Sequence, residues 1–177
     1  MQAESFCKLF IPSVYKLRTV VMLYTWLKLF HVIAVIVFLG NIFTGLFWMR
    51  LAVKTKEVRI INHSINGVIL SDRYFTIPGV IFITTAGIFA ALVGDIPLIR
   101  TGWILWSLIL FSISGILFVW KVAPLQKKLS RLTSQNNADS FDWNHFNKTF
   151  RDWELWGGIA LLTPILALIM MVLKIPK

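Results

Sequence analysis

The uncharged stretch LFHVIAVIVFLGNIFTGLFWM, Leu29–Met49, decides the fold of this chain. A helix of this length would be about 32 Å long, which matches the roughly 30 Å hydrocarbon core of a bilayer. The sequence contains further stretches without Asp, Glu, Lys or Arg at Tyr74–Gly94, Gly102–Trp120 and Trp156–Leu173. Because a backbone in lipid must satisfy its own hydrogen bonds, and four spans are too few to close a barrel, each stretch is expected to be a transmembrane helix.

The composition of the whole chain agrees with this expectation. Of its 177 residues, 57% are hydrophobic and 15% are charged, whereas soluble domains average roughly 45–50% and about 25%. One small soluble core cannot hide that much apolar surface, and a disordered chain needs low hydrophobicity. The single cysteine, Cys7, excludes an internal disulfide. We therefore predict an all-α fold, an integral membrane four-helix bundle with short interfacial helices.

The chain is expected to form one membrane domain over residues 22–177, preceded by an N-terminal extension over residues 1–21. Either Met1 or Met22 is a plausible natural start. Apolar residues at helical spacing in Val58–Leu70 predict a short helix that lies on the membrane or packs under the bundle. Aromatic residues in Phe141–Phe150 similarly suggest an interfacial stretch before the fourth span.

The charges predict the orientation. Eleven of the 18 Lys and Arg residues lie in the connections 50–73 and 121–155, and seven lie on the other side of the bilayer. The positive-inside rule places the richer side in the cytoplasm, so that both termini face outward. The net charge of +10 is assigned to contacts with anionic lipid headgroups. No nucleic-acid recognition motif accompanies it, so the lipid bilayer and not a nucleic acid is the expected partner.

Small and polar residues mark the faces that the helices turn toward one another. At 100° per residue, one face of the first span carries His31, Ala34, Phe38, Asn41 and Gly45. The fourth span presents Gly157, Ala160, Pro164, Ala167 and Met171 in a similar arc, with a kink expected at the proline. The second span offers Thr84, Gly87, Ala91 and Gly94, and the third offers Ser107, Ser112, Ser114 and Gly115.

His31 is the titratable side chain within the predicted spans, and such a residue is by default a functional-site hypothesis. It would bond a serine or a carbonyl across the bundle, ligate a cofactor, or belong to a proton or ion path. His63 and His145 lie on the opposite side of the membrane, which excludes a haem held by two histidines of one chain. Met171 has the depth and facing of His31, so the two are candidate ligands of a haem b. Copper would require more soft ligands than these.

The run WLKLFHVIAVIVFLG, Trp26–Gly40, carries a family resemblance, together with DRYFTIPG at Asp72–Gly79 and VWKVAPLQ at Val119–Gln126. The sequence is similar to a family of predicted bacterial integral membrane proteins of unknown function over most of 22–129. Trp26–Gly40 more distantly resembles the HemJ family of haem-containing protoporphyrinogen oxidases and the CopD copper-resistance proteins. The resemblance implies a multi-pass bundle in a bacterial inner membrane, with His31 at the haem-ligating position. HemJ also depends on a lysine in a later helix, and the later spans contain none here.

Three functions follow as hypotheses, and no catalytic residue is identified. The first is a haem-binding or redox-linked membrane protein that acts through His31. The alternative is a non-enzymatic subunit that assembles or stabilises a membrane complex, with other membrane subunits or copies of itself as partners; it is motivated by spans without carboxylate, lysine or arginine. The third is a small transporter or ion pathway through His31 and Asn41, although no inverted repeat is visible.

Overall fold

The structure is a computed structural model that describes residues 2–134 and 141–176, with side chains placed from Arg18 onward. The first helix is α1 (Gln2–Lys54). A second long helix consists of α2 (Val58–Ser71), the π-helical segment η1 (Asp72–Thr76) and α3 (Ile77–Val93). A third consists of α4 (Gly102–Leu117), the π-helical segment η2 (Phe118–Val122) and α5 (Ala123–Ser134), and α6 (Trp143–Leu173) is the fourth. Among the described residues there is no strand, so the all-α prediction is confirmed.

In the part of the chain that the structure describes, four helices are long and apolar enough to cross a membrane, and each overlaps one predicted span. They are Arg18–Lys54, Val58–Val93, Gly102–Ser134 and Trp143–Leu173, with lengths of 31 to 37 residues. A bilayer needs only about 20 helical residues. Each helix therefore continues well beyond the hydrocarbon, and the charged connections begin as helix rather than as loop.

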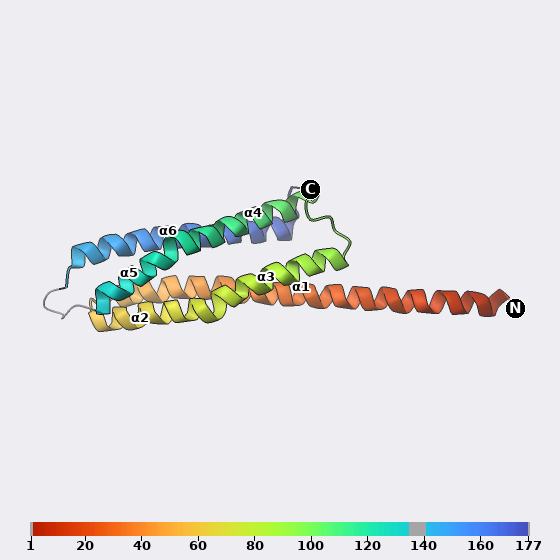
Figure 1. Cartoon of the computed structure of the whole chain (residues 1–177), viewed down its shortest axis with the longest axis horizontal. Coiled ribbons are helices and arrows are strands. Elements are labelled where there is room, and N and C mark those ends of the chain that lie inside the picture. The colour runs from red at the N-terminus through yellow and green to blue at the C-terminus, as the bar shows by residue number, and fades with distance from the viewer. Residues whose placement is uncertain (1, 135–140, 177) are drawn as a thin grey trace.

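The helices pack as two pairs (Figure 1). α1 lies along α3, and α4 lies along α6. α2 and α5 pair with each other and join the two layers at the end of the bundle that carries the basic connections. The N-terminal extension expected over residues 1–21 is helical from Gln2 and projects beyond the ends of the other helices as the first part of α1.

The basic end of the bundle has a hydrophobic core like that of a soluble protein. Met49, Ile61, Leu129 and Phe146 are each 0% exposed there. The sequence predicted that this helix lies on the membrane or packs under the bundle, and α2 packs under the bundle. It continues into α3 rather than lying on the membrane. The aromatic stretch 141–150 leads into α6, and its residues Phe141, Phe146 and Phe150 face this core. Most residues of this core lie beyond the predicted spans, where water drives burial of apolar side chains.

The small-residue arc of α6 faces α4, as predicted. This contact supplies a hydrogen bond that the proline of α6 removes from its own helix. Pro164 has no N–H, so the carbonyl of Ala160 lacks its usual helical partner. Ser114 of α4 donates a hydrogen bond of 2.6 Å to that carbonyl, and Ser107 donates one of 3.1 Å to the carbonyl of Ala167. Two hydroxyl groups thus hold α4 against α6, and α6 continues without a break through Pro164.

Candidate functional site

A cavity of about 480 Å³ lies between the α1–α3 pair and the α4–α6 pair. This volume falls within the roughly 300–1,000 Å³ typical of small-molecule sites. The wall is mainly apolar and receives residues from each of the four long helices; its large apolar members include Phe38, Ile42, Leu46, Ile77, Val80, Phe111, Phe118, Val122 and Trp153. The cavity is therefore suited to a guest that is mostly hydrocarbon.

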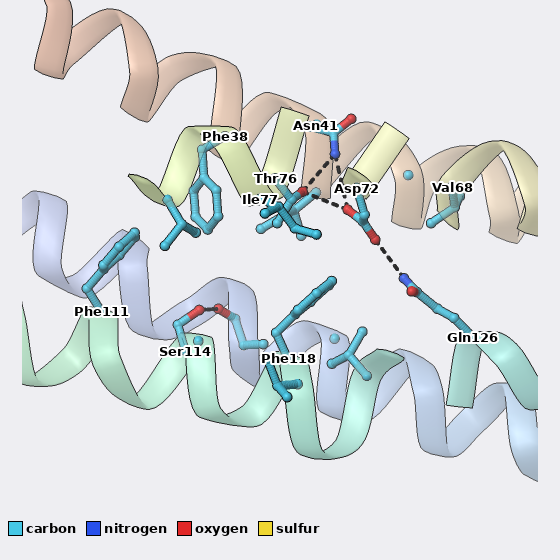
Figure 2. Close-up of a pocket in the computed structure, with 18 of the residues that line it drawn as sticks. Phe38, Asn41, Val68, Asp72, Thr76, Ile77, Phe111, Ser114, Phe118 and Gln126 are labelled. Atoms are coloured by element: carbon cyan, nitrogen blue, oxygen red, sulfur yellow. Dashed lines mark hydrogen bonds between the residues drawn. The ribbon is translucent and has the colours of Figure 1, made fainter. Parts of the chain in front are cut away.

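One end of the cavity is polar and is centred on Asp72, which is only 7% exposed (Figure 2). Its Oδ1 accepts hydrogen bonds from Thr76 Oγ1 at 2.7 Å and from Asn41 Nδ2 at 3.2 Å. Its Oδ2 accepts a hydrogen bond from Gln126 Nε2 at 2.8 Å. Asn41 Nδ2 also donates to Thr76 Oγ1 at 2.9 Å. The cluster joins side chains of α1, η1 and α5 around one carboxylate.

Both π-helical segments lie against this cavity. In η1 the N–H of Ile77 bonds to the carbonyl of Asp72, five residues back, and in η2 the N–H of Ala123 bonds to the carbonyl of Phe118. Each wide turn inserts one extra residue into an otherwise α-helical run. Asp72 and Thr76 occupy the two ends of η1, and both contribute to the cavity wall. Such single π turns occur frequently at functional sites.

Asp72 has no cationic partner among the described residues. The ion pair found among the described residues joins Arg50 to Glu154, so no described Lys, Arg or His nitrogen lies within 4.0 Å of the Asp72 carboxylate. Arg73, its neighbour in the chain, is exposed. Lys121 of η2 lies over the ring of Trp156, 5.4 Å from its centroid. Within the described part of the chain, the hydrogen-bond donors to this buried carboxylate are all neutral.

The other end of the cavity is aromatic. The rings of Phe38 on α1 and Phe111 on α4 are 5.5 Å apart and link the two helix pairs. Apart from Thr76, the hydroxyl groups along the wall donate to backbone carbonyls, those of Thr84 and Ser112 within their own helices and that of Ser114 to Ala160. The polar groups available to a guest are therefore concentrated around Asp72.

His31 lies outside this cavity and docks α1 onto α3. Its Nδ1 donates a hydrogen bond of 2.8 Å to the carbonyl of Ile83, and a bond across the bundle is one of the three roles expected for this side chain. The ring rests against Gly87, where an added Cβ would lie 3.0 Å from Nδ1 and from Cε1. Asn41, proposed with His31 as an ion path, bonds instead within the Asp72 cluster.

The candidate haem ligands are not brought together by any interaction in the described part of the chain. Met171 is half-buried on α6, and neither it nor His31 lines the cavity. The residues that the structure describes contain no group of three or more His, Cys, Asp or Glu side chains able to hold a metal ion. Haem ligation by His31 and Met171 stays a prediction.

Asp72 and Gln126 were not identified as site residues from the sequence, whereas Asn41 was placed correctly on an inward face. Asp72 lies two residues before the predicted span Tyr74–Gly94 and was counted with the charged connection. The signal that could have found it is its spacing, because Asp72, Thr76 and Gly79 fall on one helical face with polar and small side chains.

The fold and the cavity together define an all-helical integral membrane protein with a partly open cavity between its helix pairs. The chain belongs to the family of predicted integral membrane proteins DUF2269, whose family model matches residues 25–175. That match includes all of the cavity residues. No curated protein matches the chain, and no solved structure does.

Proposed function

We propose that the protein is a membrane-embedded binding protein that holds a small, largely apolar molecule in the cavity between its helix pairs. The observation that carries the proposal is an apolar cavity of about 480 Å³ with a buried, hydrogen-bonded carboxylate at one end. The apolar wall would accept the body of the guest, and the Asp72 cluster would orient its polar end. Small-molecule sites usually combine an apolar lining with a few polar groups that fix the orientation of the ligand.

A role in helix packing alone accounts poorly for this cavity. Protein interiors are close-packed and contain few voids larger than a water molecule, so a space of about 480 Å³ between the helix pairs is larger than helix packing alone requires. A guest would fill the space between the helix pairs.

The test is a cavity-filling substitution with a matched control. An added Cβ at Gly115, on the cavity wall, meets nothing within 4 Å, so Gly115→Leu would occupy the cavity without a clash at that atom. Gly158 is equally open but exposed on the outside of α6, and Gly158→Leu is the control. The probe is a diazirine-bearing octanol, cross-linked by light to the protein in lipid nanodiscs and mapped by mass spectrometry.

The proposal expects saturable labelling of α3 and α4 at cavity residues, suppressed by excess octanol. Gly115→Leu should lose this labelling, and Gly158→Leu should keep it. Labelling that is confined to lipid-facing residues, or that is identical in both variants, would contradict the proposal.

Haem binding is the second candidate function, and one feature of His31 favours it. Because its Nδ1 carries the proton donated to the Ile83 carbonyl, its Nε2 holds the lone pair that a metal requires. Met171 is the second ligand in this proposal. A reduced-minus-oxidised spectrum of protein expressed with ample haem tests it: an α-band that is lost in His31→Ala and altered in Met171→Leu supports the role, and its absence from the wild-type protein removes it.

A further inference from the structure

We infer that the guest of the cavity is a lipophilic amine, whose protonated nitrogen binds the Asp72 carboxylate while its apolar chain lies along the wall toward Phe38 and Phe111. This inference rests on the proposed binding function and names the chemical class of the ligand.

The first argument is charge. A buried carboxylate is costly unless an opposite charge or strong hydrogen bonds compensate it. Asp72 is 7% exposed, and the described residues place no cationic nitrogen within 4.0 Å of it. Its nearby basic residues are engaged elsewhere or point outward: Lys121 covers Trp156, and Arg73 is exposed. A cationic guest would supply the missing counter-charge, and an anionic guest would be repelled.

The second argument is the remaining hydrogen-bonding capacity of Asp72. An ionised carboxylate has about four lone-pair sites. Oδ1 uses two of them, for Thr76 and Asn41, and Oδ2 uses one, for Gln126. One site on Oδ2 remains for a further donor. An ammonium N–H bound there would make a charge-assisted hydrogen bond, which is roughly twice as strong as a neutral one.

The third argument is depth. Asp72 directly precedes the exposed residues Arg73 and Tyr74, which lie at the boundary where the predicted second span begins. The polar end of the cavity therefore lies toward the headgroup level of the basic side. The Phe38–Phe111 pair at the other end lies near the midpoints of the first and third predicted spans, and therefore nearer the middle of the bilayer. A lipophilic amine in the same leaflet has its nitrogen at the headgroup level and its chain toward the middle of the bilayer. It would therefore enter the cavity in the orientation in which it binds.

The experiment compares two photoprobes of equal length, a diazirine-bearing octylamine and the corresponding octanol, on protein in nanodiscs of neutral lipid. Asp72→Asn removes the charge but keeps the shape of the side chain, and Asp152→Asn removes a carboxylate exposed on α6. We expect Asp72→Asn to raise the amine concentration for half-saturation about tenfold or more. Its labelling by the alkanol should be unchanged, and Asp152→Asn should resemble the wild-type protein with both probes.

The outcomes separate this inference from the function on which it rests. If both probes label the cavity equally and Asp72→Asn changes neither, the guest is neutral: the amine is wrong and the binding function stands. If neither probe labels the cavity saturably, the binding function itself fails. Should Asp72→Asn bind neither probe although the wild-type protein binds both, Asp72→Glu provides the deciding variant. It retains the charge and must still prefer the amine to the alkanol; loss of that preference would overturn the inference.

Discussion

Replacing Gly87 by alanine tests the contact that docks α1 onto α3. The new Cβ would lie 3.0 Å from both Nδ1 and Cε1 of His31, so the ring would have to move by a few tenths of an ångström. The ring is anchored by its 2.8 Å hydrogen bond to the carbonyl of Ile83, one turn earlier on the same helix as Gly87. Moving away from residue 87 therefore strains or breaks that bond.

The size of the effect follows from two opposing contributions. Overpacking a filled interior costs about 1–3 kcal/mol, whereas alanine in place of glycine within a helix gains up to about 1 kcal/mol. Gly158→Ala is the matched control, because a Cβ there meets nothing within 4 Å and gains only the helix preference. We expect Gly87→Ala to be less stable than Gly158→Ala by about 1–3 kcal/mol.

The assay is unfolding in mixed micelles with increasing SDS, followed by tryptophan fluorescence, in a double-mutant cycle with His31→Ala. Without the imidazole ring, the new methyl group has no neighbour to displace, so the penalty of Gly87→Ala should disappear. The coupling free energy between the two positions should be about 1–3 kcal/mol. Equal stability of Gly87→Ala and Gly158→Ala, or an undiminished penalty in the His31→Ala protein, would refute the proposed docking contact.

Two further predictions concern helix pairing and orientation. Ser114→Ala removes a hydrogen bond to the carbonyl of Ala160 on the neighbouring helix and should cost about 0.6–1.7 kcal/mol, whereas Ser112→Ala removes only a bond within α4 and should be near neutral in the same SDS assay; equal losses would contradict the asymmetry. With the basic connections in the cytoplasm, Asp95→Cys in a Cys7→Ser protein should react with an impermeant maleimide on intact cells, and His63→Cys only after permeabilisation; the reverse pattern would invert the orientation.

The membrane fold could be predicted because one physical requirement determines it. Lipid excludes charge, so the charge-free stretches mark the spans, and each lies on one of the four long apolar helices. The helical arcs also identified correct inward faces. Phe38, Asn41 and Gly45 line the cavity, and Gly157 of the α6 arc is buried. The choice of faces succeeded because small and polar side chains are tolerated mainly between helices.

The site could not be predicted, because it depends on pairings between distant parts of the chain. Asp72 lies in a charged connection, two residues before a predicted span, and a charged residue at such a place indicates a membrane boundary. Its burial requires α2 to continue through η1 into α3, and it also requires Gln126, which is 54 residues away, to close over the carboxylate. The helices continue beyond the bilayer because a hydrophobic core at the basic end stabilises them there. This continuation could not be predicted, and the burial of Asp72 and its contact with Gln126 both depend on it.

The most direct test of the central claim is a crystal structure of the protein grown in a lipid mesophase with a bromine-terminated octanol. The account predicts an anomalous bromine peak inside the cavity, near Phe38 and Phe111, with the hydroxyl end of the same molecule directed toward Asp72. Bromine peaks confined to the lipid-facing surface, with the space between the helix pairs closed by side chains, would contradict it.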